Sequence, residues 1–494
     1  MYKSESKKQL PFENFYLPFG GHLNGKNRWV QLAALVPWDE FEEEYAQKFS
    51  ATGMGAPAKS FRMALGSELI KRKLDITDEE VVEQIRENPY LQYFIGMEGY
   101  RDEVPFDASM MTHFRERLSL EMIGRINERV IENGDKKKEL NEAGGNGEEE
   151  AAKNQGKLLL DATCIPQDIR HPTDISLLNE AREKTERIID KLHAASGKEQ
   201  KKPRTYRRKA RQEYLTLAKK RRKGWKALWK SIRKQLGYIR RNFKSIGKLV
   251  ETVGKTCLSA RDMKNLEVCH EVFQQQESMH KRRSHRVENR IVSIGQPHVR
   301  PIVRGKASGE TEFGSKVLVS VVDGNVRIEK LSWDNFNEGP LLQESIEAYK
   351  KRYGCYPESV HVDAAFRTKD NREYCRKNGI RMSGSMPGRP SKKQEEKSSE
   401  QRRLEAADTR DRIPVEGKFG NCKRKYGLDR IYAKRTDTSE CEIAIGILLL
   451  NLEKEYRKRK EAGIIFVIFI LPQIHAGIKN LSWYKAINHL KIAA

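Results

Sequence analysis

The sequence predicts an α/β protein whose mixed sheet is interrupted by a basic helical insertion and preceded by an all-α domain. Apolar runs typical of strands occur near residues 158–169, 313–331, 360–363 and 380–383. Between the first two runs, residues 176–290 are strongly basic and repeat apolar side chains at helical spacing. Helical patterns alone fill residues 10 to about 130. Strands that alternate with helices indicate a layered α/β core.

The charge balance indicates a polyanionic partner. The chain has 494 residues and a formal net charge of +25, from 94 lysines and arginines against 69 acidic residues. This length exceeds a single hydrophobic core, so we expect roughly two to four domains. Self-repulsion at this charge favours nucleic acid as the partner, with an acidic membrane surface as the second choice.

The cysteines, the N-terminal segment and the apolar run 464–471 indicate where in the cell the protein is expected to be. The seven cysteines contain no CxxC pair, which indicates reduced thiols rather than disulfides or a zinc site. The N-terminus lacks the apolar core of a signal peptide. The apolar run 464–471 is much shorter than the roughly 20 residues of a membrane span, so we expect a buried element there. We expect a cytoplasmic, nucleoid-associated protein without a membrane partner.

Residues 1–132 form the expected helical N-terminal domain. Thr77 to Glu80 has the capping-box form, and the helix that it opens should stop at Asn88-Pro89. Further helices are expected near 61–70 and 110–118. Short helices with tight breaks suit a helix-turn-helix DNA-binding domain and an ordinary bundle equally well. Residues 133–156 are rich in Gly, Asn, Glu and Lys, and we expect a flexible linker there.

Residues 176–290 form the expected basic helical insertion. An apolar stripe runs from Trp225 to Leu249 at three- and four-residue steps, and residues 178–192 suggest an antiparallel partner helix. The density of positive charge on the rest of the stripe helix favours contact with DNA phosphates over a merely solvated face. The basic residues that we expect to bind DNA are Lys226, Lys230, Arg233, Lys234, Arg240 and Arg241.

The core is expected to comprise residues 157–175 and 291–455. Its first part is a strand that is buried on both faces. Its second part should contain a hairpin with a turn at Asp323-Gly324, a helix over 341–353, a strand at 360–363, a helix over 371–377 and a strand at 380–383. A charged loop is expected over 384–411, and an apolar helix over 441–452. Residues 456–494 form a C-terminal tail.

Three carboxylates are candidates for metal chemistry. Asp161 and Asp363 each close an apolar strand, where an acid is costly unless it is paired or metal-bound. Glu416 and Lys423 are seven residues apart, so they share a face if Pro414 opens a helix there. Three such acids can hold two hard cations for phosphoryl transfer. Rival acids are Asp168, Asp174, Asp323, Asp334 and Glu338.

These segments resemble bacterial insertion-sequence transposases of the DDE class. Arg412-(3)-Glu416-(6)-Lys423 matches the last three members of the Y-(2)-R-(3)-E-(6)-K signature of one large transposase group, although Thr409 takes the place of the tyrosine. LLLDATCIPQDIRHPTD and HVDAAFRTKDNREYCRKNGIRMSG are similar to the blocks that carry the first and second aspartate. ENPYLQYFIG and the segment around QLPFENFYLPFGG resemble the helical N-terminal domain of the same proteins. The likeness extends to about residue 455.

The resemblance implies a fold, an activity and a site. It implies a ribonuclease-H-like core in which Asp161, Asp363 and Glu416 hold two Mg²⁺ ions, with Mn²⁺ as a substitute, and in which Arg412 and Lys423 contact DNA. It implies cleavage at the ends of an insertion sequence and joining of the 3′-hydroxyl ends to target DNA. The partners would be double-stranded DNA, as terminal inverted repeats and target, and a second copy of the chain. A catalytically inactive DNA-binding derivative and a nuclease without strand transfer are the alternatives.

Overall fold

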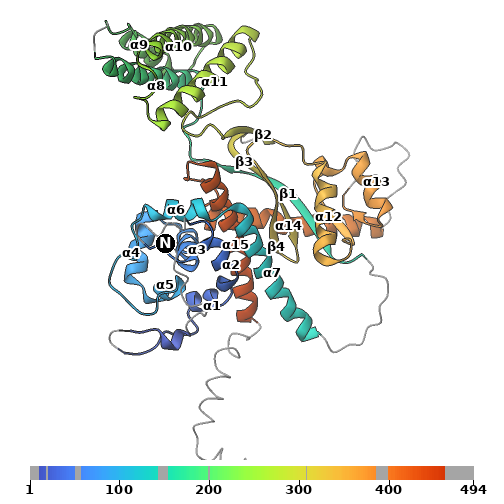
Figure 1. Cartoon of the computed structure of the whole chain (residues 1–494). Coiled ribbons are helices and arrows are strands. Elements are labelled where there is room, and N and C mark those ends of the chain that lie inside the picture. Colours follow the sequence, from blue (N-terminus) through green and yellow to red (C-terminus); the bar gives the residue numbers. More distant parts are fainter. Residues whose placement is uncertain are drawn as a thin grey trace, which may run out of the picture.

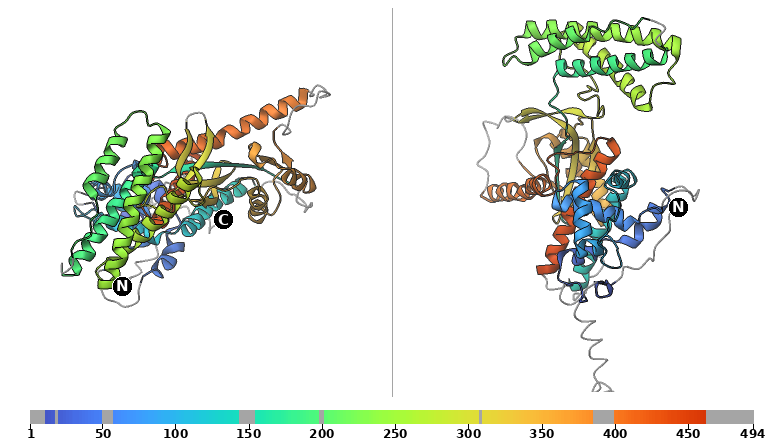
Figure 2. Two further views of the ribbon diagram at one scale, coloured as in Figure 1. Left: turned by 90° about the horizontal axis from the view of Figure 1, so that it is seen from above. Right: turned by 90° about the vertical axis from the view of Figure 1, so that its left-hand side faces the viewer.

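The chain forms a mixed α/β structure with a central sheet and many helices (Figure 1). The computed structural model describes residues 11–17, 20–49, 57–142, 154–197, 201–306, 309–384 and 399–461. The N-terminal helices lie on one side of the sheet, α12 and α13 lie on the other, and the helical insertion projects beyond it (Figures 1 and 2). The expected strand–insertion–hairpin–helix–strand–helix–strand order is found among these residues, with one further strand, β2, between the insertion and the hairpin.

The sheet mixes antiparallel and parallel strands. Its order is β2-β3-β1-β5-β6, and β4 also pairs with β3. β1 pairs antiparallel with β3 and parallel with β5, so it is the central strand that the apolar run predicts. Asp323 and Gly324, both with positive φ, form the predicted turn between β3 and β4. The strands are β1 (Lys157–Pro166), β2 (Arg300–Lys306), β3 (Gly309–Val322), β4 (Asn325–Ser332), β5 (Ser359–His361) and β6 (Arg381–Met382).

The two faces of the sheet bury different helices, because successive strand residues point to opposite sides. Leu158 and Leu160 of β1 pack with Leu342 and Ile346 of α12 (Leu341–Tyr353). Leu159 faces the other way, toward α14 (Ser399–Lys425) and α15 (Thr436–Glu461). Gly354, with φ 74°, ends α12 as predicted, and α13 (Lys369–Lys377) follows β5.

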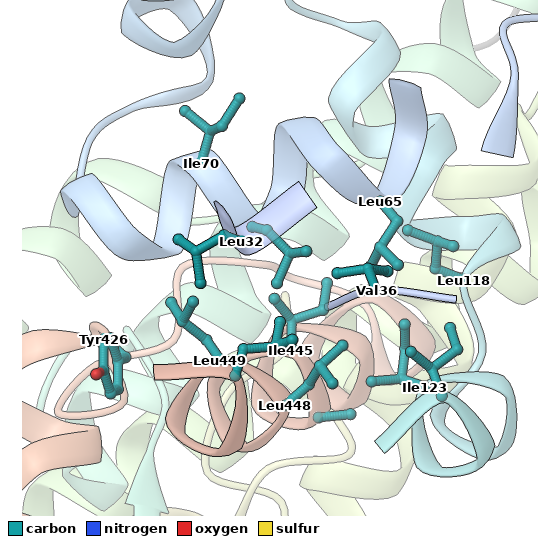
Figure 3. Packing of buried hydrophobic residues seen from close by; sticks show 14 of the residues in the cluster. Leu32, Val36, Leu65, Ile70, Leu118, Ile123, Tyr426, Ile445, Leu448 and Leu449 are labelled. Atoms are coloured by element: carbon teal, nitrogen blue, oxygen red, sulfur yellow. The ribbon is translucent and has the colours of Figure 1, made fainter. Parts of the chain in front are cut away.

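The N-terminal helices share one hydrophobic core with α15 and with this second face of the sheet. Figure 3 shows Leu32 and Leu65 packed against Ile445 and Leu449 of α15. Helix α15 is buried on nearly every side, which explains its run of apolar residues. Thr77 caps α4 by accepting from the Glu80 amide, and α4 ends before Asn88, as predicted. The helices are α1 (Arg28–Ala33), α2 (Trp38–Ala46), α3 (Phe61–Leu74), α4 (Asp78–Glu87), α5 (Pro89–Phe94), α6 (Met110–Arg117) and α7 (Leu120–Glu142).

A buried ion network crosses the contact between these helices and α15. Arg115 donates to Glu68 at 2.9 Å and to Asp78 at 2.7 Å. Glu442 of α15, only 1% exposed, pairs with Arg72 of α3. Burial raises the pKa of the Glu68 carboxyl to about 7, although Arg115 and Lys71 oppose that shift. The network therefore fixes α15 to the N-terminal helices by charge as well as by apolar packing.

The insertion is a bundle of α8 (Asp174–Ala195), α9 (Arg207–Ala218), α10 (Trp225–Val253) and α11 (Ala260–Arg282). The predicted apolar stripe of α10 packs on α8. The prediction of an antiparallel partner is wrong. Leu178 shares a cluster with Ile232 near both N-termini, and further along Thr185 accepts from Asn242 at 3.0 Å, so α8 and α10 run parallel. Helix α9 makes this possible because it returns the chain between them.

Two other predicted loops differ in the structure. Residues 399–411, expected in a charged loop, begin α14, and Pro414 lies inside this helix rather than in its first turn. A proline that interrupts helical hydrogen bonding in an exposed, charged segment explains why the sequence did not predict a helix there. Helix α7 continues to Glu142, within the range expected to be a linker, and residues 143–153 lie outside the described ranges. The same holds for the apolar run 464–471.

No helix among the described residues is long and apolar enough to cross a membrane.

Replacing Arg115 with alanine should lower the free energy of unfolding by about 3–5 kcal/mol, because Glu68 and Asp78 lose their shared buried counter-ion. Arg125, which pairs with Glu44 on the surface, is the matched control, and Arg125→Ala should cost roughly 0–1 kcal/mol. Urea unfolding of the two variants measures the difference. Equal costs would show that the network contributes nothing to stability.

Candidate active site

Asp161, Asp363 and Glu416 line one cavity of about 530 Å³ beside β1. The cavity forms where β5 ends. Because β5 pairs only with residues 157–159 of β1, the next residues of β1 have open space beside them, and α14 passes there. The structure thus brings together three acids that lie 202 and 53 residues apart in the sequence.

Asp161 lies in the middle of β1, so the prediction that it closes the strand is wrong. It nevertheless stands just past the last residue of β1 that pairs with β5. Its carboxylate accepts from the Ala162 amide at 2.8 Å. Burial raises the pKa of Asp161 to about 6, the neighbouring carboxylates of Asp363 and Glu338 add to the rise, and the Ala162 amide and Arg412 oppose it. A cation at this place would favour the ionised form.

Asp363 lies two residues after His361, where β5 ends, rather than at the end of the strand as predicted. Its carboxylate caps the short 3₁₀ helix η2 (Ala364–Phe366) by accepting from the Ala365 amide at 2.8 Å. Phe366 is fully buried in the α12 cluster and holds this turn against the sheet. One carboxylate oxygen is used by the cap, which orients the side chain and leaves the other oxygen for the cavity.

Glu416 is exposed on α14, and Lys423 lies on the same face seven residues later, as the spacing predicts. The Lys423 ammonium donates to the carbonyl of Cys164 in β1 at 2.8 Å. Arg412, one helical turn before Glu416, also lines the cavity. All three acids and both basic residues of the predicted site therefore line one cavity.

The other end of α14 is fixed by ion pairs that the sequence did not reveal. Arg381 of β6 donates to both carboxylate oxygens of Asp408, at 2.7 and 2.9 Å, and Lys157 of β1 pairs with Asp411 at 2.7 Å. His361, Asp408 and Asp411 lie close enough to share an ion. Because Arg381 and Lys157 already neutralise the two aspartates, we assign this cluster to positioning α14.

The predicted DNA-binding residues of α10 are all exposed, and they lie in the insertion rather than at the cavity. Lys234 pairs with Glu213 at 2.8 Å, and Arg240 pairs with Glu277. Trp225, half exposed, stacks on Trp229 at the start of the helix. The guanidinium of Arg241 lies 5.0 Å from the ring centres of Tyr206 and Tyr238. The other basic residues of the predicted set are exposed: Lys226, Lys230 and Arg233.

Among the rival acids, Glu338 alone lines the cavity, together with Lys316. Asp168 lies within 3.6 Å of Arg430, and Asp334 within 3.3 Å of Arg300. Asp174 accepts from Arg290 at 2.7 Å, and Asp323 is the hairpin turn. Lys316 gave no signal in the sequence, because it is one of several alternating polar residues of a long strand.

Two family models match the chain. The one described as "Transposase DDE domain" covers residues 360–453, and the one described as "Transposase domain (DUF772)" covers residues 18–117. Over 159 residues the chain is 33% identical to "Uncharacterized protein ORF8 in nfe locus" of Rhizobium meliloti, which is 31% of this chain and 69% of that protein. The chain belongs to the insertion-sequence transposases. No solved structure matches this transposase significantly.

Transposases with a DDE domain generally use divalent metal ions, and the cavity of this transposase suits one. Carboxylate oxygens are the ligands that Mg²⁺ and Mn²⁺ prefer. Here they come from β1, from the turn after β5 and from α14. Burial is the main cause of the raised pKa of Asp161, and repulsion by Asp363 adds to it. The DDE model covers Asp363 and Glu416, whereas Asp161 lies outside both matched regions.

Metal binding should depend on pH through Asp161. The carboxyl must lose its proton to bind a cation, so the affinity for Mn²⁺ should fall about tenfold per pH unit below pH 6 and stay level above it. Titration calorimetry across this range measures the affinity. Asp168→Asn, a charge change on the exposed loop after β1, should keep the wild-type profile, whereas Asp161→Asn should remove the slope. An unchanged slope in Asp161→Asn would assign the titration to another group.

Proposed function

We propose that this transposase cleaves the DNA at the ends of its element and joins the freed 3′-hydroxyl ends to target DNA. The observation that carries the proposal is the convergence of Asp161, Asp363 and Glu416 in one cavity. Acids from two adjacent strands and from a following helix, on a mixed sheet with β1 at its centre, support a ribonuclease-H-like core. Nucleases use the same kind of core, so the proposal of strand transfer is supported by the transposase family matches rather than by the fold.

The side chains of the cavity divide the chemistry between them. The three carboxylates would hold two Mg²⁺ ions, and the bound ions would supply electrostatic stabilisation for an in-line phosphoryl displacement. Arg412 projects into the same space and can donate to the scissile phosphate. Lys423 uses one of its three donors on the Cys164 carbonyl, which places its charge beside the β1 acid.

The regions outside the cavity would hold the DNA. The exposed basic residues of α10 supply phosphate contacts without reading sequence. We assign residues 1–132 to the terminal inverted repeats, since the matching transposase domain occupies residues 18–117. Two ends must be brought together for one integration event, so we propose a homodimer on DNA with one end per protomer.

Asp161→Asn, Asp363→Asn and Glu416→Gln should each lower the rate of cleavage at the element end by at least about a thousandfold in Mg²⁺, because each removes a metal ligand. Binding of the same DNA in EDTA should stay within about threefold of wild type, because the predicted phosphate contacts of α10 lie elsewhere. Cleavage of a plasmid that carries the flanking repeats measures the rate.

Glu344→Gln is the control for these variants, since Glu344 is exposed on α12 and lies outside the cavity. It should cleave at the wild-type rate. Normal cleavage by Asp363→Asn would refute the assignment of the active site. Cleavage without joined products in the wild type would indicate a nuclease rather than a transposase reaction.

The insertion should contribute electrostatically to DNA binding. Replacing Lys226, Lys230 and Arg233 with alanine should lower the slope of log affinity against log salt by about 2.7, because each lost phosphate contact removes about 0.9. Fluorescence anisotropy with a duplex at several salt concentrations measures the slope. The same number of charges removed from Lys351, Arg376 and Lys377, exposed on α12 and α13, serves as control. Equal slopes in the two triple variants would refute the role of the insertion.

A further inference from the structure

A fourth carboxylate faces the candidate metal site, and it carries its own counter-ion. Glu338 and Lys316 both line the cavity with Asp161, Asp363 and Glu416. Their charged groups are 2.7 Å apart, and the two side chains are 16% and 14% exposed. The Lys316 ammonium also donates to the Phe336 carbonyl at 2.8 Å and lies 4.7 Å from the centre of the Phe336 ring.

The loop that carries Glu338 is fixed to the turn that carries Asp363. Asn371 of α13, 2% exposed, donates to the Gly339 carbonyl at 2.7 Å and to the Phe366 carbonyl at 2.8 Å. Gly339 lies so close to this turn that a Cβ atom would stand 3.1 Å from the Thr368 side chain and 3.3 Å from the Ala365 carbonyl oxygen. Glu338 is therefore held beside Asp363 by buried contacts, rather than placed there by a mobile surface loop.

The charge balance of the cavity indicates how Glu338 and Lys316 would respond to bound metal. Four carboxylates face three cations, Lys316, Arg412 and Lys423. Glu338 disfavours ionised Asp161, as Asp363 does, so Glu338 acts electrically on the metal site although Lys316 partly neutralises it. Divalent cations would attract Glu338 and repel the ammonium of Lys316. A lysine that is displaced in this way would find its best new partner in an anionic phosphate.

We propose that Glu338 is a fourth carboxylate of the metal site and that Lys316 is a DNA-phosphate ligand that Glu338 holds until metal is bound. In the metal-free protein the two side chains neutralise each other. When Glu338 turns to the metal site, Lys316 becomes available to the DNA strand in the cavity. Metal binding and DNA binding are thereby coupled through one ion pair. This inference rests on the proposed function, since it uses the same cavity.

Titration of the full chain with Mn²⁺ alone tests whether Glu338 is a ligand of the metal site. Glu338→Gln should weaken the binding of at least one ion about tenfold or more. Lys316→Ala should bind Mn²⁺ more tightly than wild type, because it removes a competing cation. Glu344→Gln is the matched control for a lost glutamate charge on the adjacent helix. Thermal unfolding of each variant confirms that it is folded, and Glu338→Asp should recover part of the affinity.

The second test asks whether Lys316 binds DNA phosphate once metal is bound. It measures the affinity for a duplex that lacks the element ends, in EDTA and in Mn²⁺. Mn²⁺ should strengthen the binding of DNA to wild type, and Lys316→Ala should lose most of this gain. Glu338→Gln should bind DNA in EDTA more tightly than wild type does, because Lys316 is no longer paired. If the Glu338–Lys316 ion pair had only a structural role, Glu338→Gln would not strengthen DNA binding in EDTA while Lys316→Ala loses the gain from Mn²⁺.

The outcomes separate this inference from the proposed function. If Glu338→Gln binds Mn²⁺ within about twofold of wild type while Asp161→Asn binds poorly, the fourth ligand is refuted and the triad stands. If Lys316→Ala keeps the full gain from Mn²⁺, the coupling is refuted. If Asp161→Asn and Asp363→Asn bind Mn²⁺ as wild type does, the proposed active site itself fails.

Discussion

The attachment of α14 to the sheet determines whether the three acids of the cavity can meet. Glu416 is exposed on a helix that contains an internal proline, but its neighbour Val415 is buried in the hydrophobic core that includes Leu159 of β1. Polar contacts on either side of Glu416 add to this packing. Lys423 donates to the Cys164 carbonyl downstream, and Arg381 binds both oxygens of Asp408 upstream. Lys423 thus has a structural task in the metal-free protein, in addition to the DNA contact that its signature position implies.

The local charge at the cavity differs from the net charge of +25 on the whole chain. Most of the surplus is spread over exposed lysines and arginines, with a dense set on the insertion, whereas four carboxylates gather at the cavity. Without bound metal ions, a phosphate backbone would be repelled from such a cavity, because its four carboxylates outnumber its three cationic side chains. The basic surfaces therefore give affinity, and the acidic cavity makes productive contact depend on bound metal. Separating the two functions keeps the protein from requiring metal for every encounter with DNA.

Much of this arrangement follows from local sequence, and the parts that do not have identifiable causes. The apolar run before Asp161 and the Thr77 cap predicted β1 and α4 because each depends on near neighbours. The parallel packing of α8 on α10 could not be predicted, since an apolar stripe defines a face but no direction. The Arg381–Asp408 contact joins residues of unremarkable type, and only the fold brings them together. Glu338 could be named as a rival acid, but its partner Lys316 could not.

The two regions that we assign to DNA differ in how they are joined to the active site. The N-terminal helices share a continuous hydrophobic core with α15 and with the sheet face that Leu159 occupies, and the Arg115 network ties them to Glu442. The insertion instead buries its apolar residues in clusters of its own, built from α8 to α11 and from Ile291 and Ile294. A region with a shared core cannot rotate without breaking it, whereas a region with a separate core can. The N-terminal helices are therefore suited to fix one DNA end relative to the cavity, and the insertion is suited to adapt to the path of the strand.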